Sequence, residues 1–182
     1  MRRMLWILAI TVALASAQEK QSAEAQNVEL TVYLLSGSAQ GTDDVPQDLL
    51  STLKQLHSVF AYKSYKLTES FVLRGRSDQS SPTRRRASTN GILPGSGLRY
   101  VFGYDRLWVS GDPPRTVHLD RLSLDLNGAP VTTADGKQRS ENVANVESDL
   151  DIRDGQKIVV GKSSVNMGGD ALILVIVPKV ID

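Results

Sequence analysis

The chain has 182 residues, with 21 basic and 20 acidic side chains, and it contains no cysteine. This nearly balanced charge excludes a general electrostatic attraction to nucleic acid or to an anionic membrane. The absence of cysteine excludes a disulfide framework, so the chain must build an ordinary hydrophobic core, in one domain or in two small ones.

Residues 1–17 have the features of an export signal. Two arginines precede the apolar run LWILAITVALA, and Ala15-Ser16-Ala17 matches a small-x-small cleavage site. The apolar run is about 11 residues long, whereas a membrane-spanning helix needs about 20. We therefore predict cleavage after Ala17, a periplasmic or secreted location, and no transmembrane helix after cleavage.

Residues 18–27 are polar and are predicted to be disordered, and residues 28–75 are predicted to form a strand–helix–strand unit. VELTVYLL begins this unit as a strand, because β-branched and aromatic residues favour strands. In QDLLSTLKQLHSVF, four apolar residues fall on one helical face: Leu49, Leu53, Leu56 and Phe60. A period of two then places four residues on one face of a strand, or of a hairpin turning near Thr68-Glu69: Tyr65, Leu67, Phe71 and Leu73.

Residues 76–97 are rich in Ser, Arg, Gly and Pro. This composition predicts a basic linker between two units. Arg84, Arg85 and Arg86 are either a solvated cationic loop or contacts for an acidic partner or an anionic polymer. No aromatic residue lies between these arginines, which argues against single-stranded nucleic acid as a ligand.

Residues 98–182 are predicted to form a β-rich unit. LRYVFGYDRLWVSG predicts a hairpin that turns at residues 103–106. Tyr100, Tyr104 and Trp108 lie on this hairpin and are candidate partner contacts. In TVHLDRLSLDL the apolar residues change parity near Asp120-Arg121, which predicts a β-bulge.

Three further strands follow in the last part of the chain: NVESDLDIR, QKIVVGKSS and ALILVIVPKV. Asp154 and Gly155 predict a two-residue type I′ turn, which would place Leu150 opposite Val159. Residues 171–177 are apolar at every position, so this strand should be covered on both faces or lie at a subunit contact. The predicted fold class is therefore α+β and β-rich, with a sandwich-like antiparallel unit in its second half.

Two motifs resemble ligand loops but fail on spacing. DGQKIVVGKSS has five residues between its first glycine and Gly161-Lys162, whereas a phosphate loop has four, and β-branched residues replace the flexible loop. DLDIRDG has Arg153 where a calcium loop has its third carboxylate, and Val160 where it has a bidentate glutamate. We predict no nucleotide, no metal and no other cofactor.

Catalytic chemistry has little support in the sequence. His57 borders the helical stripe, and His118 alternates with Val117 and Leu119, so it should point away from their face. No G-x-S-x-G motif occurs. Two carboxylates that act as a catalytic pair come together only in the folded protein and leave no local sequence motif, so an envelope hydrolase is an alternative. We nevertheless predict that the protein is not an enzyme.

The run DLDIRDGQKIVVGKSSVNMGGDALILVIVPKVI resembles the end of the core domain of secretins, the ring-forming outer-membrane channels of type II and III secretion and type IV pili. The resemblance lies in Asp154-Gly155-Gln156, in Val159-Val160-Gly161 and in the closing strand at 174–180. It ends at Lys162-Ser163, where secretins commonly have a second glycine and an apolar residue. The resemblance implies a secretin-related module that associates with envelope machinery, and not a channel formed by this chain alone.

We therefore predict an exported, non-catalytic envelope protein that acts by protein contacts in a secretion or pilus-type assembly. The prediction allows the protein to form oligomers. A β module that binds an extracellular polymer is the second hypothesis, and an exposed platform of Tyr100, Tyr104 and Trp108 would favour it. Carboxylates that converge in a cleft would favour the hydrolase. An open edge on the last strand would favour protein contacts, because edge strands pair with partners.

Overall fold

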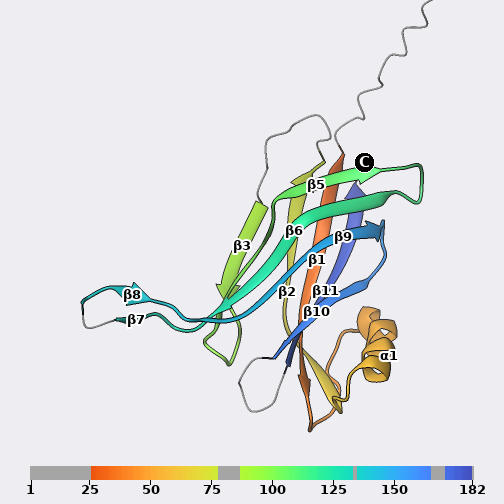
Figure 1. The fold of residues 1–182 in the computed structure, drawn as a ribbon. Helices are drawn as coiled ribbons and strands as arrows, with labels where there is room; N and C mark the ends of the chain where they lie inside the picture. The colour runs from red at the N-terminus through yellow and green to blue at the C-terminus, as the bar shows by residue number, and fades with distance from the viewer. Residues whose placement is uncertain (1–25, 78–86, 133–134, 165–170, 182) are drawn as a thin grey trace, which may run out of the picture.

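The structure, a computed structural model, describes residues 26–77, 87–132, 135–164 and 171–181. The predicted export signal and Arg84, Arg85 and Arg86 lie outside the described residues. Within the described residues, no helix is both long and apolar enough to span a bilayer. Two antiparallel sheets face each other, and the α-helix packs on the far side of one of them (Figure 1).

Sheet A joins strands from both ends of the chain. Its order is β10 (Ile158–Ser164), β11 (Ala171–Ile181), β1 (Asn27–Ser38) and β2 (Ser64–Arg76), with all neighbours antiparallel. The two predicted sequence units therefore share one sheet, because the first strand pairs with the last from Asn27 to Gly37. Asn27, which the sequence predicted to be disordered, belongs to β1 and pairs with both neighbouring strands.

Sheet B contains β3 (Ala87–Ile92), β4 (Arg99–Tyr104), β5 (Arg106–Ser110), β6 (Thr116–Asn127) and β9 (Asn142–Arg153). β4 and β5 both pair with β6, β9 also pairs with β6, and β3 pairs with β4. The linker predicted at 76–97 is thus wrong for its last part, because residues 87–92 form a strand of the sheet.

The hairpin predicted at residues 103–106 is also corrected by the structure. Tyr100 lies opposite Leu126 and Leu107 lies opposite Leu119, so β4 and β5 continue in one register along β6. The chain instead turns at residues 111–115, between β5 and β6, where Gly111 has a φ of +81°. Glycine is favoured there because a side chain makes the left-handed region costly.

Beyond the sandwich, the chain between β6 and β9 forms a projecting arm, which we define as residues 129–141. It contains the two-stranded pair β7 (Val131–Thr132) and β8 (Gln138–Arg139). Figure 1 shows this pair extending away from both sheets. Every described residue of the arm is exposed, so its conformation rests on local pairing and not on burial in the sandwich.

Sheet A contributes to two hydrophobic cores. The larger core lies between the sheets, and a smaller one lies between sheet A and the helical segment η1 (Gln47–Leu49) and α1 (Leu50–Val59). Alternate residues of β11 enter each core, with Leu174 in the first and Ile173 in the second. The predicted coverage of the final strand on both faces is confirmed, since residues 171–176 are all buried.

A bulge in β2 changes which core its side chains enter. Leu34 lies opposite Glu69 whereas Leu35 lies opposite Leu67, which leaves Thr68 as an extra residue. As a result, the side chain of Leu67 packs on the helix side and that of Phe71 packs between the sheets. The prediction that Tyr65, Leu67, Phe71 and Leu73 share one face is therefore wrong, and β2 is one continuous strand.

The bulge predicted near Asp120-Arg121 is confirmed. The register between β6 and β9 shifts between Leu119 and Leu122, and Arg121 has a φ of +47°. The extra residue allows Leu119 and Leu122 to enter the same core although their parity differs.

The turn at Asp154-Gly155 carries the chain from sheet B to sheet A. The Gln156 N–H donates to the Arg153 carbonyl at 2.9 Å, and Gly155 has a φ of +73°. β9 pairs with β6 and β10 pairs with β11, so the predicted pairing of Leu150 with Val159 does not form. Positive φ at the second central position alone is the pattern of a type II turn, which corrects the predicted type I′ turn. The predicted fold class, α+β, β-rich and sandwich-like, is confirmed.

Candidate functional site: the outer face of sheet B

Sheet B buries one face and exposes a polar one. Trp108, His118 and Asp151 lie directly opposite one another on β5, β6 and β9. Side chains alternate along a strand, so these three point to the same side, away from the buried Val117 and Leu119. The predicted orientation of His118 is therefore confirmed.

We name Ser110, His118 and Asp151 the His118 cluster. The Ser110 Oγ lies 2.6 Å from His118 Nε2, and the His118 Nδ1 lies 2.6 Å from Asp151 Oδ1. A carboxylate only accepts hydrogen bonds, so in the neutral imidazole Nδ1 carries the proton and donates to Asp151. Nε2 is then the acceptor for the Ser110 hydroxyl. The side chain of His118 is 18% exposed and that of Asp151 is 74% exposed.

Trp108 restrains the plane of the histidine ring. The two rings are stacked, with centroids 4.8 Å apart and an angle of 6° between their planes. The guanidinium of Arg106 lies 5.7 Å from the centre of the indole and also forms an ion pair with Asp120. The imidazole is thus held on one face by an aromatic ring and at both nitrogens by hydrogen bonds.

A second polar group surrounds the bulge of β6. The Arg121 N–H donates to Asp149 Oδ1 at 2.7 Å, and its guanidinium contacts Asp105 Oδ2 at 3.2 Å. Asp105 is buried, and it lines a hollow of about 290 Å³ together with Tyr104 and Arg121. Burial raises the pKa of Tyr104. The ion pair compensates the cost of placing a carboxylate in this hollow.

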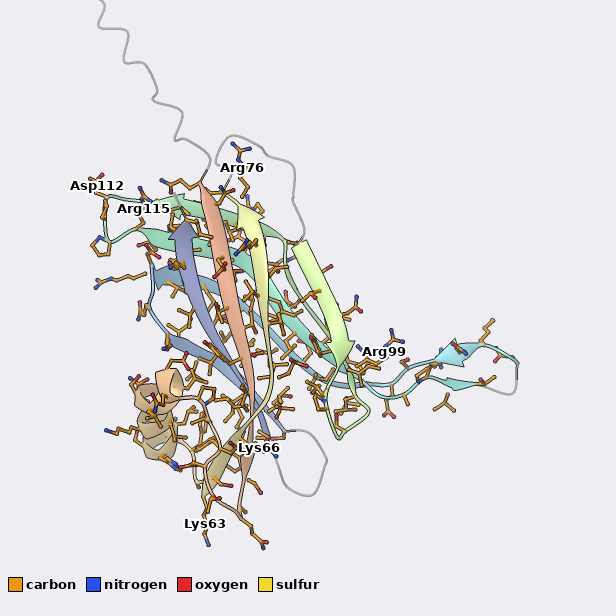
Figure 2. The ribbon with its side chains drawn as sticks, turned by 180° about the vertical axis from the view of Figure 1, so that it is seen from behind. Lys63, Lys66, Arg76, Arg99, Asp112 and Arg115 are labelled. Carbon is orange, nitrogen blue, oxygen red and sulfur yellow. The ribbon has the colours of Figure 1, made fainter. Side chains whose placement is uncertain are left out.

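A larger hollow, of about 440 Å³, lies toward the end of the sandwich that is opposite the β5–β6 turn. It is bounded by Leu67 and Lys66 on β2, by the loop at 93–98, and by Leu172 on β11. Figure 2 shows Lys63 and Lys66 at this end of the molecule, whereas Asp112 and Arg115 mark the β5–β6 turn at the other end. The His118 cluster, which begins at the last residue of β5, is therefore separate from this hollow.

The structure separates the residues that the sequence singled out. Tyr100 and Tyr104 are each 5% exposed and belong to the core between the sheets, so they form no surface platform with Trp108. Phe71 stacks on Tyr100 with ring centroids 5.2 Å apart, so the Tyr100 ring is part of the packing between the two sheets. Trp108 alone of these three reaches the outer face, where it contacts His118.

Asp154 and Gly155 have structural roles in the turn between the sheets. The carboxylate Oδ1 of Asp154 accepts the Val180 N–H at 2.9 Å, and the Gly155 N–H donates to the Pro178 carbonyl at 2.8 Å. These bonds attach the turn to the end of β11. The carboxylate is therefore engaged with the backbone, as a turn residue commonly is.

Sequence reasoning did not predict that Ser110 and Asp151 would meet His118. The available signal was the run GDPPR at 111–115, which has the composition of a turn. A turn there pairs β5 with β6 and places Trp108 opposite His118. Asp151 is 33 positions from His118, and no local pattern predicts that β9 pairs with β6. Among the described residues, no group of three or more His, Asp or Glu side chains could hold a metal ion.

Comparisons with known proteins give a limited result. No family model and no curated protein matches the chain. Among solved structures, the chain is similar to the InvG secretin domain of the Salmonella SPI-1 injectisome, with 13% identity and a TM-score of 0.39 over 87% of this chain and 64% of that chain. It is also similar to ExeD of Aeromonas hydrophila, with 14% identity and a TM-score of 0.36 over 86% of this chain and 49% of that chain. The chain thus spans less than two thirds of either structure.

Proposed function

We propose that this protein is an exported, secretin-related module that acts by protein contacts in an envelope assembly for secretion or pilus biogenesis. These contacts require no catalysis. The sequence resemblance of the C-terminal residues to secretins suggests the class of assembly, and the projecting arm supports a role in contacts.

The arm is the observation that carries this proposal. Its strands β7 and β8 pair with each other, and every described residue from 129 to 141 is exposed. Val131 is 66% exposed although it is a β-branched apolar residue in a strand. An element that buries no apolar surface within its own fold gains little from folding alone, so a partner surface explains why it projects.

Open strand edges provide a second kind of contact, but not where the sequence suggested. β11 lies inside sheet A, between β10 and β1, so the last strand has no open edge. Among the described residues, β3 pairs only with β4 and β2 pairs only with β1. Exposed strand edges present unpaired backbone groups that an extended partner segment can bind.

The polymer-binding alternative loses its predicted feature, because Tyr100 and Tyr104 are buried. Arg84, Arg85 and Arg86 remain proposed contacts for an acidic partner. Their positions lie outside the described residues, so substitution of the three arginines must test them directly.

The proposal is tested by site-specific crosslinking of the mature protein in envelopes. A photoreactive amino acid replaces Val131 on the arm and, as a matched control, Val59 at the end of α1, since the two valines are 66% and 70% exposed. We expect Val131 to crosslink to an identified component of a secretion or pilus assembly, and Val59 to crosslink far less.

Native size provides the second measurement. The mature chain alone has a mass of about 18 kDa after loss of the export signal. We expect the protein extracted from envelopes to migrate well above this mass. A monomer of this size with no crosslinked partner at Val131 would overturn the proposed function.

A further inference from the structure

We propose that Ser110 is a reactive nucleophile, activated by His118 and Asp151, that accepts the acyl group of activated carboxylic esters. This inference goes beyond the proposed contact role and does not depend on it. The cluster on the outer face of sheet B supplies the evidence.

The three side chains have the connectivity that nucleophilic serine chemistry requires. The hydroxyl contacts the imidazole at Nε2, and the carboxylate contacts the same ring at Nδ1, both at 2.6 Å. In this arrangement the imidazole can accept the serine proton, and the carboxylate fixes the tautomer and stabilises the imidazolium that forms. The opposite tautomer would carry its proton on Nε2, which could then not act as a base.

The scaffold holds this geometry on regular secondary structure. Ser110, His118 and Asp151 come from β5, β6 and β9, which are neighbours in one sheet. His118 and Asp151 are paired residues, and Ser110 lies one pleat along from Trp108, the residue opposite His118. Stacking on Trp108 limits rotation of the imidazole. Groups positioned on strands are held more precisely than groups on loops.

Burial of the cluster sets the expected reactivity. Ser110 and His118 are half-buried, and each lies at the outer face, where solvent reaches it. The Asp151 side chain is 74% exposed, so water screens its effect on the imidazole. We therefore expect a nucleophile that is weaker than one in an enclosed triad.

The surroundings of the cluster select the substrate class. Neither the hollow of about 290 Å³ nor the one of about 440 Å³ includes Ser110 or His118 among its lining residues. Neither of these two hollows can therefore supply binding energy that distorts or orients a substrate at Ser110. Esters with a good leaving group, such as aryl acetates, need the least assistance, whereas peptides need the most.

The proposed step is an acyl transfer. The Ser110 Oγ forms a bond to the ester carbonyl carbon while its proton moves to His118 Nε2. The bond from this carbon to the leaving oxygen then breaks, and His118 returns the proton to the leaving alkoxide. Water attacks the acylated serine, again with His118 as base, and releases the carboxylic acid and free Ser110.

The test is covalent labelling of the mature protein with a fluorophosphonate, in which Ser110 displaces fluoride and the modified residue is located by mass spectrometry. We expect labelling at Ser110, none in Ser110→Ala, at least a tenfold slower rate in His118→Gln, and a severalfold slower rate in Asp151→Asn. Hydrolysis of p-nitrophenyl acetate should fall in the same order.

Two variants serve as matched controls. Ser123→Ala removes another half-buried serine from the outer face of β6, and His57→Gln removes a histidine that contacts Asp43 at 3.1 Å but lies outside the cluster. Both should label at the rate of the unmodified protein. Circular dichroism and thermal unfolding confirm that each variant is folded.

Labelling of the unmodified protein no faster than Ser110→Ala would overturn the proposal, as would equal labelling of Ser110 in His118→Gln. Either result would assign the His118 cluster to the stability of sheet B alone. A change in thermal stability without a change in labelling leads to the same conclusion.

Discussion

Sheets A and B have similar strands but very different faces. The central strand β11 of sheet A is buried on both faces, by sheet B on one side and by α1 on the other. β6 of sheet B has one buried face and one polar face that carries His118, Asp120 and Asp125. The stability of the fold should therefore depend mainly on sheet A, whereas sheet B has polar side chains available for chemistry or contact.

The largest expected effect comes from the centre of sheet A. Leu174 is 1% exposed and packs between the sheets, so Leu174→Ala removes apolar contacts and leaves a cavity. We expect a loss of about 2–5 kcal/mol in the free energy of unfolding, measured with urea. Ser123→Ala, on the outer face of sheet B, should change it by no more than about 0.5 kcal/mol. Equal losses in the two variants would contradict the division between the sheets.

The next effect tests the seam where the two sheets meet. Gly75 of β2 lies so close to the Tyr104 hydroxyl that an added Cβ would overlap it. Gly75→Ala should therefore destabilise the protein by about 1–3 kcal/mol. Tyr104→Phe removes the hydroxyl, so the double variant should recover part of the loss in a double-mutant cycle. Simple addition of the two single effects would show that the close approach carries no strain.

A smaller effect tests the helix side of sheet A. The Tyr65 hydroxyl donates to the Leu56 carbonyl at 3.1 Å and joins β2 to α1. Tyr65→Phe should lower the free energy of unfolding by about 1 kcal/mol. Tyr62→Phe, in the same small core, should lower it less, because no hydrogen bond of Tyr62 to α1 is lost. An unchanged stability in Tyr65→Phe would mean that packing alone holds the helix.

The smallest effect is a dependence on alkaline pH. Burial, the hydrogen bond to Asp48 and the charge of Asp48 together raise the pKa of Tyr33 from 10.0 to about 12. The folded state thus retains a proton that the unfolded chain loses first, so this contribution is complete below about pH 10 and is lost as the pH rises toward 12. Unfolding measured across this range should be less pH-dependent in Tyr33→Phe, and parallel profiles would contradict the prediction.

Several elements could be predicted because their signals are local. Three signals depend only on the residues of their own segment: the β-branched and aromatic composition of VELTVYLL, the helical stripe from Leu49 to Phe60 and the apolar run at 171–177. The parity change at Asp120-Arg121 likewise predicts a bulge, because a strand that keeps one face buried must insert a residue there. The resulting fold class is correct for the same reason.

The candidate site could not be predicted by this reasoning. Ser110, His118 and Asp151 match no sequence motif, and their separation along the chain does not indicate that they meet. The error at residues 103–106 contributed, since a hairpin there separates Trp108 and Ser110 from β6. Tyr100 and Tyr104 are candidate partner contacts in the sequence but lie in the core, because an alternating pattern identifies two faces but not which face is covered.

The sequence by itself determined several local elements of this protein: the first and last strands, the helix, and the turn at Asp154-Gly155. Only the tertiary structure decided that β1 pairs with β11, that the Thr68 bulge sends Leu67 and Phe71 into different cores, and that Ser110, His118 and Asp151 meet on one face. The physical reason is that strand periodicity is fixed by neighbouring residues, whereas strand pairing is fixed by which apolar faces bury each other.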